Sequence, residues 1–144
     1  MFKKILVPTD GSELALRAAG VAADLAKTHG AEVVGVYVID PFPYIGIGEA
    51  SAVGLQAYLA EAQRAAGAAL EAVKAACQAQ GVAFAGDTIE RNVVYEGILE
   101  TAKAEGCDLI VMASHGRQGV KALVLGSVAQ KVLTYSPVPV MVVK

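Results

Sequence analysis

Residues 3–13, Lys-Lys-Ile-Leu-Val-Pro-Thr-Asp-Gly-Ser-Glu, decide how the chain folds. The apolar run at its centre is continuous rather than alternating, which predicts a strand buried on both faces, as in a parallel sheet. Ser12 is a favourable helix N-cap, and Glu13 adds negative charge to the first turn of the helix that follows. Apolar residues then recur at helical spacing as far as Gly30, a typical C-cap residue. The stretch therefore predicts a strand, a short turn and a helix, in that order.

The same order repeats along the rest of the chain. Patterns typical of strands occupy 32–39, 82–90, 108–113 and 138–143. Patterns typical of helices occupy 55–80 and 95–105, and the glycine-spaced segment 114–126 opens a further helix that ends near Tyr135. Strands that alternate with helices form mainly parallel sheets. We therefore expect an α/β fold, a doubly wound five-stranded parallel sheet with helices on both faces. Residues 1–144 would form one domain, with the polar strand 82–90 near the sheet edge.

Composition excludes several classes of function. Apolar types make up 55% of the 144 residues and charged types 18%, which is typical of a folded globular domain. The net charge of −2 argues against a nucleic-acid partner, which would need a clustered basic surface. No apolar run approaches the ~20 residues of a membrane span, and the first residues do not resemble a signal peptide, so we expect a cytoplasmic protein with no membrane partner. Cys77 and Cys107 lie in no metal-ligand spacing and are expected to be small core residues.

The fold itself predicts where a ligand would bind. In doubly wound sheets, ligands bind beyond the carboxyl ends of the strands, where neighbouring connections leave in opposite directions. The segments at those ends are Pro8–Ser12, Val38–Pro41 and Ala113–Ser127. An acidic residue at the end of a central strand is costly unless it is solvated or paired, so Asp10 is either a site residue or a helix cap.

The third of these segments carries the chemistry. Gly116 leaves room for an anion to approach the backbone, and Gly126-Ser127 stands where a helix should begin. Free amides, a hydroxyl and the positive end of the helix dipole would suit a phosphate there. Two readings stay open: a phosphate site, or glycines that only shape a tight loop before a capped helix. His115 is likewise either a donor to phosphate or an ordinary loop histidine.

Segments along the whole chain resemble the universal stress protein family. They are ILVPTDGS at 5–12, VYVID at 36–40, DLIVMASHGR at 108–117, LGSVAQKV at 125–132 and PVPVMVV at 137–143. The resemblance implies the doubly wound fold already expected, and a homodimer formed through the last strand. Where the family often has Gly-x-Pro after the third strand, this chain has Asn92-Val93-Val94. Asn92 tolerates left-handed backbone angles, so we expect the turn to be kept.

Some members of that family bind ATP, and their pattern is Gly, two residues, Gly, nine residues, then Gly followed by Ser or Thr. Gly116, the nine residues 117–125 and Gly126-Ser127 match its later parts, whereas Ala113 replaces its first glycine. The resemblance implies ATP (or AMP or ADP) as the ligand, with Mg²⁺ on the phosphates. It implies that Asp10 contacts the ribose or the metal–phosphate region, that the backbone of Val38 meets the adenine edge, and that Arg117 adds a cation. The binding residues that it implies are Pro8, Thr9, Asp10, Val38, Met112, Ala113, His115, Gly116, Arg117, Gly126, Ser127 and Val128.

Three functions from different classes follow. The first is an ATP-binding stress-response protein that acts as a dimeric sensor or switch with unidentified protein partners. The second is a dimeric interaction module of the same fold that binds no nucleotide, which Ala113 would allow. The third is an enzyme that hydrolyses ATP. Against the third, the sequence has no P-loop lysine and no defensible Ser–His–Asp set, so we expect at most slow hydrolysis and assign no catalytic residue.

Overall fold

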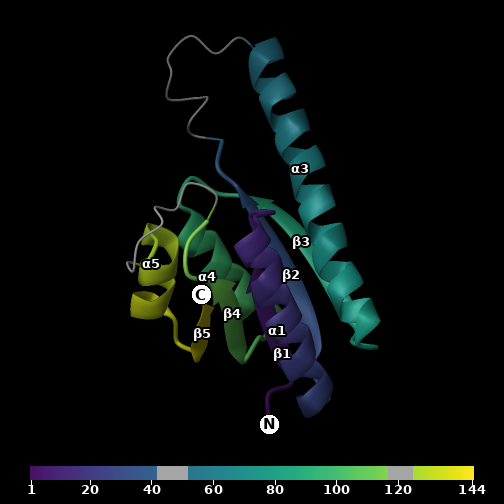
Figure 1. Cartoon of the computed structure of the whole chain (residues 1–144). Coiled ribbons are helices and arrows are strands. Elements are labelled where there is room, and N and C mark those ends of the chain that lie inside the picture. The colour runs from purple at the N-terminus through teal and green to yellow at the C-terminus, as the bar shows by residue number, and fades with distance from the viewer. Residues whose placement is uncertain (42–51, 117–124) are drawn as a thin grey trace.

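The computed structural model describes residues 1–41, 52–116 and 125–144 (Figure 1). Its elements, in chain order, are β1 (Lys4–Pro8), α1 (Glu13–His29), β2 (Glu32–Ile39), α3 (Ala52–Ala79), β3 (Phe84–Glu90), α4 (Val94–Glu105), β4 (Leu109–Ala113), α5 (Ser127–Tyr135) and β5 (Val140–Val143). The predicted order of elements is confirmed. The bounds differ most at the starts of α3, β3 and β5. At β5 the reason is plain, because prolines at 137 and 139 have no amide hydrogen to donate to the strand ladder.

The strands form one five-stranded sheet in the order β3-β2-β1-β4-β5, and every neighbouring pair is parallel. The predicted doubly wound parallel sheet is therefore confirmed, as is the edge position of β3. β1 lies at the centre, between β2 and β4. The chain leaves β1 toward β2 but leaves β4 toward β5, so the connections diverge between β1 and β4. This divergence is the switch point at which doubly wound folds bind ligands.

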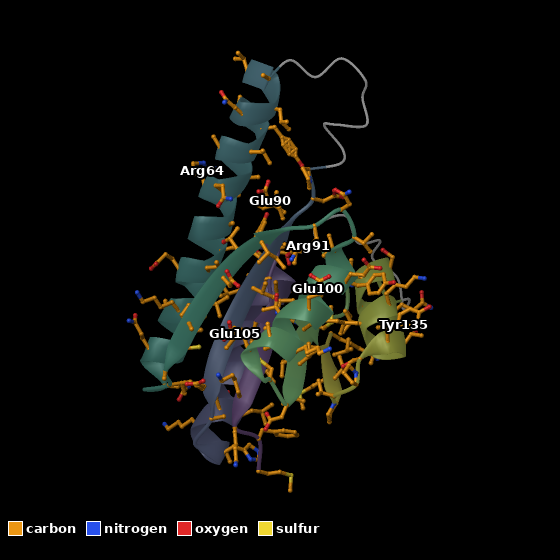
Figure 2. The ribbon with its side chains drawn as sticks, turned by 180° about the vertical axis from the view of Figure 1, so that it is seen from behind. Arg64, Glu90, Arg91, Glu100, Glu105 and Tyr135 are labelled. Carbon is orange, nitrogen blue, oxygen red and sulfur yellow. The ribbon has the colours of Figure 1, made fainter. Side chains whose placement is uncertain are left out.

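Two hydrophobic clusters lie on opposite faces of the sheet. Ile5, Val7 and Val111 point to one face, where they pack with α1 and α3. Leu6 and Met112 point to the other face, where they pack with α4 and α5. In Figure 2, which shows the molecule from behind, α4 and α5 lie in front of the sheet. Helices on both faces are thus confirmed.

Small side chains allow the helices to lie close to the sheet. The six buried residues of α1 are all alanines, which allow its backbone to lie close to the sheet. α3 has 28 residues, and its buried residues begin only at Ala66. Its first half extends past the carboxyl ends of the strands (Figure 1). α1 begins and ends as predicted, because the Ser12 hydroxyl accepts from the Ala15 amide (3.1 Å) and Gly30 adopts φ 67°.

The turn between β3 and α4 is kept, as expected, although Asn92 does not use the left-handed backbone conformation that it would tolerate. No non-glycine residue in the described part of the chain has a positive φ. The Arg91 amide donates to the Ile39 carbonyl (3.0 Å), and the Arg91 guanidinium pairs with Glu100 of α4 at 2.7 Å. Figure 2 shows these two side chains directed toward each other. The turn therefore depends on β2 and α4 rather than on a special backbone conformation at Asn92.

A buried thiol and a carboxylate lie side by side in the chain at the amino end of the sheet, and the carboxylate holds two strands together. Cys77 and Cys107 are both free and buried, as predicted, and burial raises the pKa of the Cys107 thiol to about 11. Asp108 accepts from the backbone amides of Lys3 (2.9 Å) and Lys4 (3.1 Å) and so ties the start of β1 to β4.

Among the residues that the structure describes, none of the helices has the length and apolar character of a membrane-spanning helix.

Candidate functional site

The turn after β1 is held by its own side chains. Thr9, which is buried, donates its amide to the Val36 carbonyl (2.9 Å) and accepts from the Gly11 amide at its hydroxyl (3.1 Å). The Asp10 carboxylate accepts from the Ser12 amide at 2.9 Å. Gly11 has φ 82°, a conformation that favours glycine. Because the α1 cap is Ser12, Asp10 fixes the turn before the helix rather than capping it.

A second turn lies beside the first, after β4. The Ser114 amide donates to the Val143 carbonyl of β5 (2.8 Å), and the Gly126 amide donates to the Ser114 carbonyl (2.7 Å). Gly126 is the N-cap residue of α5 and has no side chain with which to cap the helix. Ser127 is therefore the first helical residue and not the cap. The amides of a first helical turn have no partners within their own helix, so a ligand can accept hydrogen bonds from them.

Two glycines of the second turn lie in close contact with neighbouring residues. A Cβ added at Gly116 would collide with Oδ2 of Asp10. A Cβ added at Gly126 would lie 3.0 Å from the Cα of His115 and 3.2 Å from the Ser114 carbonyl oxygen. The positions at 116 and 126 therefore exclude a side chain because of the residues that face them. Gly116 therefore lets the second turn lie against the Asp10 carboxylate of the first, and Gly126 lets the start of α5 lie against the residues that follow β4.

The remaining predicted residues lie around the same edge of the sheet. Pro8 ends β1, and Met112 and Ala113 end β4. Val38 lies in β2, two positions past the residue that pairs with Pro8. The Val38 side chain packs among the α4 and α5 cluster, so its backbone rather than its side chain is the part available to a ligand.

Ala113 can be placed by strand alternation. Val111 faces α1 and α3, and Met112 faces α4 and α5, so the Ala113 methyl lies on the α1 and α3 face. The residue is 9% exposed. The methyl group that replaces the family glycine is therefore packed at the end of the strand.

Two further predicted residues follow Gly126 at the start of α5: Ser127, which is exposed, and Val128, which is half-buried. Arg117 lies outside the described residues, as does most of the segment between β2 and α3.

Sequence reasoning missed three residues that organise this edge. Ser114 was assigned no role, although it links β5, α5 and His115 through hydrogen bonds. Gly11 has the left-handed φ of the first turn, and only its place after Asp10 hinted at this. The Tyr58 hydroxyl of α3 donates to the Asp40 carbonyl at the exit of β2 (2.8 Å), and no pattern could have revealed a contact between those two elements.

A hollow of about 260 Å³ adjoins the first turn from the side of α1 and α3. Thr9, Gly11 and Ser12 line one end of it, and α3 lines the other with alanines and the Glu61–Arg64 ion pair. Neither Gly116 nor Gly126 lines it, so the hollow adjoins the first turn but not the turn after β4. In the parts of the chain that the structure describes, no group of three or more His, Cys, Asp or Glu side chains is placed to bind a metal.

Comparisons with known proteins agree with this architecture. The family model described as the universal stress protein family matches residues 1–144. Universal stress protein MJ0531 of Methanocaldococcus jannaschii is 38% identical over 145 residues, covering 100% of this chain and 83% of the relative. A universal stress protein of Thermus aquaticus is 37% identical over 146 residues and covers 100% of both chains.

Solved structures show the same fold. The structure of protein MJ0577 superimposes with a TM-score of 0.85 at 31% identity, over 100% of this chain and 96% of the other. At 22% identity, where likeness shows the fold alone, the neighbours include a universal stress protein in complex with cAMP (TM-score 0.71; 99% of this chain, 96% of the other). They also include one from Archaeoglobus fulgidus in complex with dAMP (TM-score 0.68; 99% and 98%). The match of the family model to every residue, and of relatives over the full length, shows that this chain belongs to the universal stress protein family.

Proposed function

We propose that this protein binds ATP, or AMP or ADP, at the carboxyl edge of the sheet, between the turn after β1 and the start of α5. One observation carries the proposal. Gly116, after β4, lies against the Asp10 carboxylate after β1, and Gly126, the N-cap residue of α5, lies against the residues that follow β4. A phosphate beside these glycines would accept hydrogen bonds from backbone amides at the start of α5, and the helix dipole would stabilise it by about 0.3–1 kcal/mol.

The other residues would each bind a different part of the nucleotide. Asp10 would accept from the ribose hydroxyls, and the backbone of Val38 would bind the adenine edge. His115, Ser127 and Val128 would surround the phosphates. Because the described residues hold no metal-binding cluster, Mg²⁺ would be bound mainly by phosphate oxygens and water, its usual partners. The complexes of two relatives with cAMP and dAMP support an adenine nucleotide, since they share this fold.

We further propose that the protein acts as a homodimeric sensor or switch. β5 is the last strand of the sheet, and Met141 on it is 39% exposed. An edge strand with an exposed apolar side chain favours pairing with a second copy. A Met141→Lys variant should lower the dimer fraction in sedimentation velocity, and a wild-type monomer at micromolar concentration would contradict this part of the proposal.

The decisive experiment is calorimetric titration of nucleotide-stripped protein with ATP and Mg²⁺. We expect a dissociation constant in the micromolar range, and a rise in melting temperature equivalent to about 2.7 kcal/mol at a hundredfold excess over that constant. Asp10→Asn should weaken binding. No heat and no shift in melting temperature would refute nucleotide binding and leave the dimeric interaction module as the function.

A further inference from the structure

We propose that Ser114 is a positioning residue that holds His115 with its proton on Nε2, so that the neutral imidazole can donate to a phosphate. The inference rests on the proposed nucleotide site and names a residue that the family pattern leaves unassigned. It begins from the hydrogen bond between the Ser114 hydroxyl and Nδ1 of His115, at 3.1 Å.

Ser114 is buried and hydrogen-bonded at both of its backbone groups. It is 6% exposed, its amide donates to Val143 of β5, and its carbonyl accepts from Gly126 at the start of α5. Both backbone groups are thus bound by elements of the sheet and of the helix. The hydroxyl is thereby held in one place, and it can set the orientation of the ring beside it.

His115 lies where its ring would matter. Its Cα and Cβ approach Gly126 on one side, and the next residue, Gly116, faces Asp10 on the other. The ring therefore belongs to a residue that adjoins both glycine positions of the proposed phosphate site. With the Ser114 hydroxyl donating to Nδ1, the ring proton must be on Nε2, and that nitrogen becomes a donor. The opposite tautomer would present a lone pair to the phosphate oxygen and repel it.

Because the neutral ring held in this way already donates from Nε2, ATP binding does not require a charged His115. Without the hydroxyl, the neutral ring can turn or change tautomer, and only the imidazolium, with protons on both nitrogens, donates reliably. Among the described neighbours, Asp10 faces Gly116, and Arg17 of α1 donates to the Lys144 carbonyl at the end of β5 (2.9 Å). The first turn of α5 carries no charged side chain. Since these groups are the same in the wild type and in a Ser114 variant, the ratio of the two affinities isolates the hydroxyl.

The test measures ATP affinity of Ser114→Ala and the wild type between pH 6 and pH 8. We expect the variant to bind about three- to tenfold more weakly at pH 8, and this ratio to fall as the pH is lowered, because an imidazolium donates from both nitrogens whichever way the ring is held. Thr101→Val is the matched control, because it removes another buried hydroxyl whose bond, to Gly97 in α4, lies away from the site (2.9 Å). It should leave ATP affinity unchanged at every pH. Adenosine, which has no phosphate, should bind the wild type and Ser114→Ala equally.

Two further measurements separate positioning from general damage to the loop. In a His115→Ala background, Ser114→Ala should have no additional effect on ATP affinity, because it acts only through the ring. The ¹⁵N spectrum should show the Nε2–H tautomer of His115 in the wild type and a mixture in Ser114→Ala. The chain has two histidines, so a His29→Gln variant assigns the signals. Should Ser114→Ala fail to fold, His115→Gln, which keeps a donor near Nε2, should retain more affinity than His115→Asn.

Each contrary result has a distinct meaning. A pH-independent loss, a loss that persists without the His115 ring, or an Nδ1–H tautomer in the wild type overturns the positioning role. Failure of the wild type to bind ATP overturns the proposed function and the phosphate contact together, while the spectrum still decides whether Ser114 fixes the tautomer.

Discussion

Replacing Gly126 by alanine tests whether the close approach at the start of α5 is required for ligand binding. Gly126 has φ −64° and ψ 159°, which alanine adopts without strain, so the variant isolates the effect of the side chain. The added Cβ would lie 3.0 Å from the Cα and 3.1 Å from the Cβ of His115, and 3.2 Å from the Ser114 carbonyl oxygen. Two of these are backbone atoms of the turn, so the turn itself must move by a few tenths of an ångström.

The size of the effect follows from that overlap. Inserting a methyl group into a close-packed site costs about 1–3 kcal/mol. If the turn relaxes by moving into the space of the ligand, ATP affinity falls by about five- to 150-fold. Valine at 126 adds two more methyl groups to the same contact and should abolish measurable binding.

Calorimetry of folded Gly126→Ala with ATP and Mg²⁺ measures this directly. Gly67→Ala is the matched control, because a Cβ there meets nothing within 4 Å and α3 is exposed at that position. The control should keep wild-type affinity and gain about 0.5–1 kcal/mol in the free energy of unfolding, as alanine replaces glycine inside a helix. Wild-type ATP affinity in a folded Gly126→Ala or Gly126→Val protein would refute the placement of the phosphates at this turn.

Four further predictions concern the site and the framework. Ala113→Gly should tighten ATP binding while lowering the melting temperature, since glycine weakens the end of a strand; weaker binding would show that the methyl group is useful. Gly35→Ala should lower the free energy of unfolding in urea by about 1–3 kcal/mol, because the new Cβ would lie 2.9 Å from the Phe84 ring; an unchanged midpoint would show that the ring gives way. Burial raises the pKa of Asp108, but hydrogen bonds from the Lys3 and Lys4 amides outweigh burial, and the pKa is lowered overall. The stability that the ionised carboxylate adds is therefore lost as the pH falls through that lowered pKa. In Asp108→Asn, the free energy of unfolding measured in urea should change less with pH below about pH 4 than in the wild type. The Cys107 thiol, with its pKa raised to about 11 by burial, should resist a thiol reagent at pH 8 in folded protein and react after unfolding, and rapid labelling of the folded state would contradict its burial.

Local patterns were sufficient to predict the elements of this fold. The unbroken apolar run of β1 indicated a strand buried on both faces, and Ser12 and Gly30 marked the ends of α1 because caps satisfy backbone groups close to them in sequence. The turn after β3 was expected to be kept because Asn92 tolerates left-handed angles; it is kept, but by contacts with β2 and α4 and not by such a conformation.

The sequence by itself determined the alternating α/β order, the family, and the glycines and acid that a nucleotide site would need. Only the tertiary structure decided that Asp10 faces Gly116, because the strand order sets β1 beside β4 although the two turns are far apart in the chain. It also decided that the Ala113 methyl packs on the α1 and α3 face, and that Ser114 binds both β5 and His115. Periodicity and capping act over a few residues and can be read from sequence. Contacts between turns depend on how the sheet is assembled, and no local pattern contains that information.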